Sequence, residues 1–208
     1  MDDVVYTVGH SNHPPERFLE LLARHGVTAV GDVRSRPYSR MNPQFNRENL
    51  KRLLAAGGVA YLFLGRELGA RSEDPACYSG GKVQYDRLAR TELFRHGLER
   101  VCEGLKTHRL ALMCAEKDPL ECHRTILVAR ELQSRGVEVR HILEDGAIEN
   151  HEDALARLRA KLKLPEYDLF RTPEDVIEDA YRMQGDRIAY EYEEDAGPAG
   201  SPPMKVAP

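Results

Sequence analysis

The residues best suited to chemistry in this chain lie in the segment 110–133, LALMCAEKDPLECHRTILVARELQ. Its apolar start predicts a buried strand that ends at Cys114. A polar loop follows, and then a predicted helix carries Cys122, His123 and Arg124 in its first turn. Such a helix start favours an anion or a thiolate, because its backbone N–H groups and dipole present positive charge. The segment therefore predicts a reactive or anion-binding site.

The two cysteines of this segment suggest thiol chemistry. Cys114 would act as a thiolate nucleophile whose pKa is lowered by the helix N-terminus and by Arg124 or His123. The alternative is an inert buried cysteine at the end of a core strand. Cys122 follows after a seven-residue loop. It would serve as a resolving thiol or form a transient disulfide, and the alternative is that it faces the core.

The residues beside these cysteines have two interpretations each. His123 would act as a general acid or base, or it would cap the helix. Arg124 would hold an anionic group through its planar guanidinium. Alternatively, Arg124 forms a salt bridge to Glu116, Asp118 or Glu121.

A metal site would use Cys114, Cys122 and His123, with His10 as a further ligand. The spacing matches no common zinc pattern, and adjacent residues on a helix point to different faces. We therefore predict no metal ligands, and the residues name no cofactor.

A second polar group follows the next predicted strand, in the run DVRSRPYSRMNPQFNR at 32–47. Asp32 between nearby arginines would stay ionised and orient a substrate or accept a hydrogen bond from a ribose hydroxyl, or it would cap the loop. The arginines of this run are interleaved with Tyr38 and Phe45, which suggests a phosphate-rich or single-stranded nucleic-acid ligand. The alternative is an ordinary arginine-rich loop.

A third group, His10, Ser11 and Asn12, follows the first predicted strand and Gly9. The carboxyl ends of parallel strands share one edge of a sheet, so we expect the three groups to converge there. Tyr61, Tyr78 and Tyr85 are candidates to line the cleft or to fill the core. The predicted catalytic residues are Cys114, Cys122, His123, Asp32 and His10, and the predicted substrate-binding residues are Arg34, Arg36, Arg40, Arg124, Glu116, Ser11 and Asn12.

The elements that must position these residues alternate between strands and helices. Strands are predicted at 4–8, 27–33, 59–64, 110–113 and 137–143, and helices at 15–24, 46–56, up to 105, and 121–136. The stretch 65–82 reads as an irregular loop. This order predicts an α/β fold with a mostly parallel, Rossmann-like sheet flanked by helices over residues 1–149. A helical extension is predicted at 150–189, with helices at 152–162 and 173–183, and a disordered acidic, Pro- and Gly-rich tail at 190–208.

The composition narrows the class of protein. With 41% hydrophobic and 31% charged residues and a net charge of −4, the 208-residue chain has an ordinary globular balance and no global bias toward nucleic acid. No apolar run approaches the roughly 20 residues that span a bilayer. Four cysteines make no disulfide framework, and the N-terminal residues lack the pattern of a signal peptide. We expect a soluble, cytoplasmic protein without a membrane partner.

Four motifs, in this order and spacing, resemble the domain of unknown function 488 family: TVGHSN, DVRSRPYSRMNPQFN, YLFLGRELGA and LMCAEKDPLECHR. The resemblance covers 4–143 and implies a compact α/β domain with paired cysteines. The matching positions are His10, Asp32, Arg34, Pro37, Ser39, Phe45, Leu68, Gly69, Cys114, Glu116, Cys122, His123 and Arg124.

A looser similarity is to the sulfurtransferase, or rhodanese-like, arrangement, in which one strand ends in Asp-Val-Arg and a later strand ends in a cysteine before a helix. Here the loop after that cysteine, AEKDPLE, contains acids and a proline. Acids beside a thiolate oppose stabilisation of an oxyanion or a persulfide, which argues against sulfur or phosphoryl transfer.

We therefore rank three hypotheses for the function of this protein. The first is a cysteine-dependent enzyme, a hydrolase or transferase, acting on an anionic, phosphate-bearing or nucleotide-like substrate. The second is a nucleic-acid or nucleotide-binding module with structural cysteines. The third is a metal-binding protein.

Overall fold

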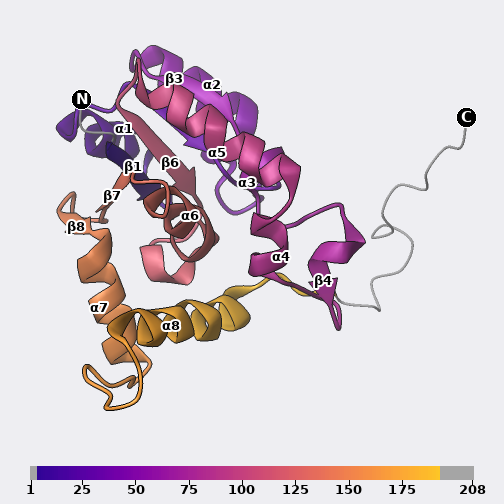
Figure 1. Cartoon of the computed structure of the whole chain (residues 1–208). Coiled ribbons are helices and arrows are strands. Elements are labelled where there is room, and N and C mark those ends of the chain that lie inside the picture. The colour runs from indigo at the N-terminus through magenta and orange to yellow at the C-terminus, as the bar shows by residue number, and fades with distance from the viewer. Residues whose placement is uncertain (1–3, 193–208) are drawn as a thin grey trace, which may run out of the picture.

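A six-stranded sheet forms the centre of the chain in a computed structural model that describes residues 4–192 (Figure 1). The strand order is β3-β2-β6-β1-β7-β8; the first five strands run parallel, and β8 runs antiparallel to β7. This confirms the predicted α/β class with a mostly parallel sheet. The strands are β1 (Val4–Gly9), β2 (Ala29–Asp32), β3 (Ala60–Phe63), β6 (Leu110–Cys114), β7 (Glu138–Ile142) and β8 (Ile148–Asn150).

Both faces of the sheet are covered, and the alternation of side chains along a strand divides the core between them. Along β6, Leu110 and Leu112 pack on one face, while Ala111 and Met113 pack on the other. The second face is covered by α1 and α2, and the first by α3 to α6. These helices are α1 (Pro15–Arg24), α2 (Arg47–Ala56), α3 (Gly65–Leu68), α4 (Tyr85–Ala89), α5 (Glu92–Leu105) and α6 (Arg130–Gln133).

Two regions differ from the predicted elements. The irregular stretch 65–82 contains α3 and a small hairpin of β4 (Tyr78–Ser79) and β5 (Lys82–Val83). The helix predicted from Glu121 is interrupted: a 3-10 turn occupies Pro119–Glu121, and a π-helical segment follows at Arg124–Ala129. Asp118 caps the 3-10 turn by accepting a hydrogen bond from the Leu120 amide, and Pro119 begins the turn.

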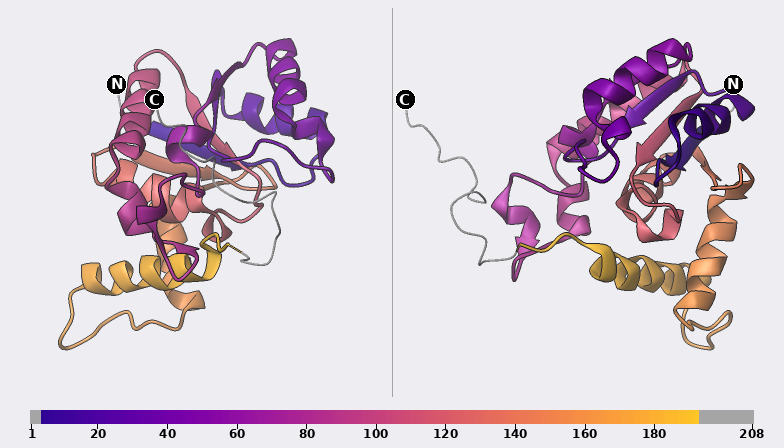
Figure 2. Two further views of the ribbon diagram at one scale, coloured as in Figure 1. Left: turned by 90° about the vertical axis from the view of Figure 1, so that its right-hand side faces the viewer. Right: turned by 180° about the vertical axis from the view of Figure 1, so that it is seen from behind.

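The chain after the sheet forms two further helices, α7 (His151–Lys161) and α8 (Pro173–Ile188), which pack against each other and against Leu120 and Ile126 (Figure 2). After α8 the chain crosses to the β4–β5 hairpin, where Tyr192 donates its amide hydrogen bond to Gly81. The predicted disordered tail at 190–208 lies outside the described residues from 193 onward. Its first residues, 190–192, lie against the hairpin.

No helix within residues 4–192 combines the length and the apolar character needed to cross a membrane.

Candidate active site

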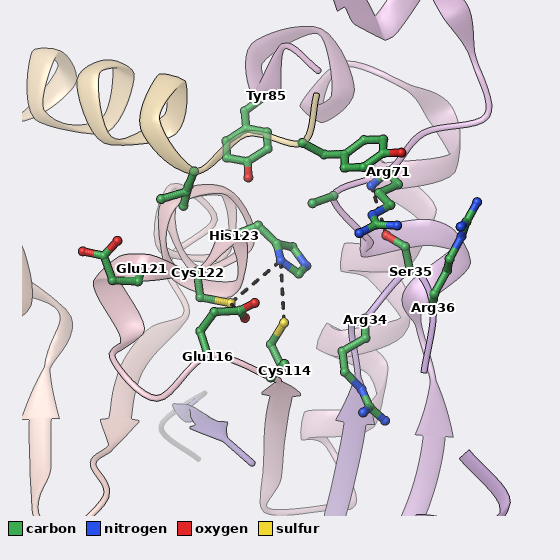
Figure 3. Close-up of a pocket in the computed structure, with 14 residues that line it drawn as sticks. Arg34, Ser35, Arg36, Arg71, Tyr85, Cys114, Glu116, Glu121, Cys122 and His123 are labelled. Carbon is green, nitrogen blue, oxygen red and sulfur yellow. Dashed lines mark hydrogen bonds between the residues drawn. The ribbon is translucent and has the colours of Figure 1, made fainter. Parts of the chain in front are cut away.

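A pocket of about 280 Å³ opens at the carboxyl ends of β2 and β6 (Figure 3). The loop after β2, the start of α4, both ends of the 114–123 segment and the end of α8 all contribute to its wall. The lining residues are Arg34, Ser35, Arg36, Ala70, Arg71, Tyr85, Cys114, Ala115, Glu116, Glu121, Cys122, His123, Ile188 and Tyr190. The pocket therefore lies at the carboxyl edge of the sheet, beside Cys114, Cys122 and His123.

One imidazole nitrogen in this pocket lies at the same distance from two sulfurs. His123 Nδ1 is 3.8 Å from the Sγ of Cys114 and 3.8 Å from the Sγ of Cys122. The other ring nitrogen, Nε2, lies 3.1 Å from the carbonyl oxygen of Val33. Because a carbonyl only accepts hydrogen bonds, Nε2 carries a hydrogen and Nδ1 is left to exchange a proton with either sulfur.

Cys122 and Glu116 form the second contact of the site. The Cys122 thiol donates a hydrogen bond to Glu116 Oε2 over 2.9 Å, and the backbone N–H of Arg124 lies 3.5 Å from the same sulfur. Burial raises the pKa of the Glu116 carboxyl, and the neighbouring sulfur raises it further. Glu116 is therefore suited to receive the thiol proton of Cys122.

Once Cys122 has given its proton to Glu116, its sulfur is the one of the two that carries the negative charge. Burial opposes ionisation of this sulfur, but the hydrogen bond from Cys114 and the positive charges of Arg124 and His123 lower its pKa well below the ordinary value. Donating that hydrogen bond, together with burial, raises the pKa of Cys114 well above the ordinary value. Burial lowers the pKa of His123, yet the Cys122 thiolate outweighs it and the net shift is upward. The prediction of a low pKa at Cys114 was therefore wrong.

The reason for that error is the interrupted helix. Cys122 has an extended backbone, with φ −139° and ψ 140°, and it precedes the π-helical segment instead of lying within a helical turn. Its sulfur consequently faces the N–H of Arg124 and shares a side with His123. Cys122 and His123 therefore lie on the same side, contrary to the prediction that these adjacent residues face different sides of a helix.

Arg124 holds the loop that carries Glu116. Its guanidinium is fully buried and donates to the carbonyl oxygens of Glu116, over 2.8 Å, and Lys117, over 3.3 Å. Among the described residues it forms no salt bridge to a carboxylate, and it does not line the pocket. Gly9 packs against the same loop, where a Cβ would lie 2.0 Å from the Glu116 carbonyl oxygen. Arg124 therefore positions the loop.

Asp32, Arg34 and His10 form a buried cluster of their own. Arg34 Nε and Nη2 donate to the two oxygens of Asp32, over 2.9 and 2.7 Å, and Nη1 donates to His10 Nε2 over 3.0 Å. Burial and the charge of Arg34 lower the pKa of His10 to about 4, so the ring is neutral. Tyr61 also donates to Asp32, and Arg34 Nη2 donates to the Phe45 carbonyl oxygen. The guanidinium of Arg34 points away from the sulfurs of the pocket (Figure 3).

The remaining predicted residues divide between the pocket and the surface. Arg36 is exposed and lines the pocket, whereas Arg40 is exposed and lies outside the lining. Ser11 and Asn12 form a turn outside the pocket, with Ser11 at φ 48° and its hydroxyl 3.3 Å from the Asn12 side-chain oxygen.

The run 32–47, which was expected to bind nucleic acid, exposes fewer aromatic and basic side chains than its sequence suggests. Phe45 is buried and stacks on His10 with ring centroids 4.5 Å apart. Arg47 lies 4.5 Å over the ring of Phe63. Tyr38 is exposed, together with Arg36 and Arg40.

Several residues of the pocket wall were not predicted from the sequence, among them Arg71, Ile188 and Tyr190. The Arg71 guanidinium lies 4.2 Å over the Tyr190 ring. Tyr85, a candidate from the sequence, points its hydroxyl into the pocket (Figure 3). Ile188 ends α8 and Tyr190 follows it, far along the chain, and no local pattern in the sequence indicates that they reach the cysteines.

Comparison with known proteins gives one match. The family model described as "Domain of unknown function DUF488" matches residues 14–130, more than half of the chain, including both cysteines and His123. Ile188 and Tyr190 lie outside the matched residues. No curated protein and no solved structure matches the chain.

Proposed function

The chain belongs to the DUF488 family, and we propose that it is a cysteine-dependent enzyme acting on an anionic, phosphate-bearing or nucleotide-like substrate. The observation that carries this proposal is the position of one imidazole nitrogen 3.8 Å from two sulfurs at the wall of a pocket. A backbone carbonyl fixes the other ring nitrogen, which is the arrangement by which a base is oriented toward a nucleophile.

Cys122 supplies the nucleophile in this proposal. Its sulfur has a proton acceptor in Glu116 at 2.9 Å and a backbone N–H donor at 3.5 Å. With its proton on Glu116, the sulfur attacks an electrophilic centre of the substrate, forming a bond to it as the bond to the leaving group breaks. His123, which the neighbouring thiolate keeps protonated on both ring nitrogens, gives its Nδ1 proton to the leaving group. Water or another acceptor then attacks the covalent intermediate and releases the sulfur, while His123 takes a proton back. The reaction is hydrolysis with water and group transfer with another acceptor.

The anionic character of the substrate rests on two arginines. Arg36 and Arg71 line the pocket, and neither forms an ion pair with a described residue. Guanidinium groups bind phosphate and carboxylate through paired N–H donors. A volume of about 280 Å³ favours a small molecule over a polymer. The proposal includes a cytoplasmic, reducing setting, in which the two cysteines stay reduced and form no disulfide.

The experiment measures how fast Cys122 is alkylated by a negatively charged and by a neutral reagent. The full chain is freed of metal with a chelator and treated with iodoacetate or iodoacetamide, and the modified cysteine is identified by mass spectrometry. Each rate is divided by that of free cysteine under the same conditions. We expect the normalised ratio of iodoacetate to iodoacetamide to exceed one.

The arginine variants give the control. Arg36→Ala and Arg71→Ala should each lower this ratio several-fold, whereas Arg40→Ala, an exposed arginine outside the pocket, should leave it unchanged. A ratio of one or less in the wild-type chain, or an equal response to all three substitutions, contradicts an anion-binding thiol site.

A further inference from the structure

The geometry of the pocket points to a metal site: we propose that Cys114 Sγ, Cys122 Sγ and His123 Nδ1 bind one Zn²⁺ ion. These three atoms all lie within 4.8 Å of one another. Two thiolates and one imidazole are ligands that zinc prefers in proteins, and a set of three protein ligands leaves a fourth position open. This inference is independent of nucleophilic catalysis by Cys122.

The distances fit a tetrahedral ion. With Zn–S near 2.3 Å and Zn–N near 2.0–2.1 Å, tetrahedral geometry separates a sulfur and a nitrogen ligand by roughly 3.6 Å. The two sulfur-to-nitrogen distances here are both 3.8 Å. The two sulfurs, which lie within 4.8 Å of each other, would have to come to roughly 3.8 Å around such an ion. An ion can therefore be bound by shifts of at most about 1 Å, within the motion of side chains about their χ angles.

The surroundings of these atoms also match a metal site. A zinc-binding histidine usually donates its other N–H to a carbonyl or carboxylate, which fixes the ring and the tautomer. His123 does this with the Val33 carbonyl oxygen at 3.1 Å. The backbone N–H of Arg124, 3.5 Å from Cys122 Sγ, would stabilise the charge of a bound thiolate. The hydrogen-bond partners that orient and stabilise zinc ligands are thus present around His123 and Cys122.

The open position faces the pocket. All three ligand residues line it, together with Glu116, whose carboxylate is 2.9 Å from Cys122 Sγ. A water molecule or an anionic oxygen of a ligand would complete the coordination of the ion. A carboxyl beside such a water is suited to take its proton.

Zinc and an electrophile would compete for the same sulfurs. A thiolate bound to zinc is withheld from alkylation, so the metal-free chain is the nucleophilic state and the zinc form is a protected one. The two proposals therefore fail separately. Alkylation is measured after chelation, and metal binding is measured without any alkylating reagent.

The experiment titrates the chelator-treated full chain with Co²⁺, whose thiolate complexes absorb in the near ultraviolet, and then displaces it with Zn²⁺. We expect thiolate-to-cobalt absorption that saturates at one equivalent and disappears when zinc is added. Cys114→Ser, Cys122→Ser and His123→Ala should each weaken zinc binding by 100-fold or more. Cys77→Ser, which removes an equally buried cysteine outside the cluster, should bind as the wild type does.

A second measurement needs no variant, and so it stands even if a substituted chain fails to fold. One equivalent of Zn²⁺ should slow the alkylation of Cys114 and Cys122 in the wild-type chain by tenfold or more, and should leave the rate at Cys102 unchanged. Absence of the cobalt–thiolate absorption, or equal metal binding by the wild type and Cys122→Ser, overturns the proposal.

Discussion

Cys122 donates its thiol hydrogen bond to Glu116 across 2.9 Å, although six positions separate the two residues in the chain. The contact exists because the extended backbone at Cys122 turns its sulfur toward the loop after β6. That loop is held in place by Arg124, which donates a hydrogen bond to the Glu116 carbonyl oxygen, and by Gly9, which packs closely against the same carbonyl. The contact between Cys122 and Glu116 therefore depends on residues that do not line the pocket.

Substitution of Glu116 tests whether this carboxyl accepts the thiol proton. In Glu116→Gln the amide cannot take a proton, so alkylation of Cys122 by iodoacetamide should slow by about an order of magnitude or more. Glu121→Gln is the matched control, because Glu121 also lines the pocket but pairs with Lys161. Equal rates in Glu116→Gln and in the wild type would show that the proton goes elsewhere.

Gly9→Ala tests the support beneath the loop. The added Cβ would meet the Glu116 carbonyl oxygen at 2.0 Å, so the loop must move. We expect the free energy of unfolding to fall by about 1–3 kcal/mol and alkylation of Cys122 to slow. Gly104→Ala, inside α5 with its nearest neighbour 3.7 Å away, should leave stability unchanged or raise it by up to about 1 kcal/mol. Chemical denaturation of both variants provides the comparison, and equal stabilities argue against a close approach at Gly9.

Arg34 and Arg36 should behave differently although they are two positions apart. Arg34→Ala leaves the buried Asp32 carboxylate without its partner, which should cost about 3–5 kcal/mol of unfolding free energy. Arg36 is exposed, and Arg36→Ala should change stability by less than about 0.5 kcal/mol. Denaturant unfolding distinguishes them. A loss below 1 kcal/mol in Arg34→Ala contradicts the structural role of this cluster.

A buried hydrogen-bonded chain joins the sheet to the last two helices. His141 bonds to Thr7 over 2.8 Å and to His151 over 3.0 Å, and His151 bonds to the Tyr181 hydroxyl over 2.7 Å. Burial lowers the pKa of His151 from 6.5 to about 4, although Glu152 and Glu149 act in the opposite direction. Both rings are therefore neutral in the folded chain near pH 7.

Acid should consequently loosen this connection. The unfolded state takes up a proton at His151 below pH 6.5, whereas the folded state does so only near pH 4. Stability from this group is thus present above pH 6.5 and is lost as the pH falls toward 4, by about 3 kcal/mol in all. Denaturant unfolding between pH 7 and pH 4 should show a smaller loss in His151→Gln than in the wild type. Equal pH dependence in the two chains would argue against a neutral buried ring.

The sequence predicted what depends on local periodicity, and it missed what depends on distant packing. The apolar runs that became β1, β2 and β6 were recognisable, because strands covered on both faces are continuously hydrophobic. The same reasoning placed the cysteines and His123 at one sheet edge. A helical pattern from Glu121, however, concealed the extended residue that gives Cys122 its environment.

Which other residues line the pocket depends on tertiary contacts that the sequence does not show. Phe45 and Arg34 appeared as ligand-binding groups, but both are buried, because the loop after β2 folds back over the sheet. Tyr190 and Arg71 meet only because the end of α8 returns to the hairpin. Such pairs leave no trace in the spacing of residues.

The most direct test compares the four cysteines of the metal-free wild-type chain in a single alkylation experiment with mass-spectrometric detection. Cys102 is partly exposed, whereas Cys77 is as buried as Cys122 but lies outside the pocket. If Cys122 forms the reactive centre with His123 and Glu116, iodoacetamide should modify it at least tenfold faster than Cys102 and Cys77. If the rates instead follow exposure, with Cys102 first and Cys122 as slow as Cys77, the pocket contains no activated thiol.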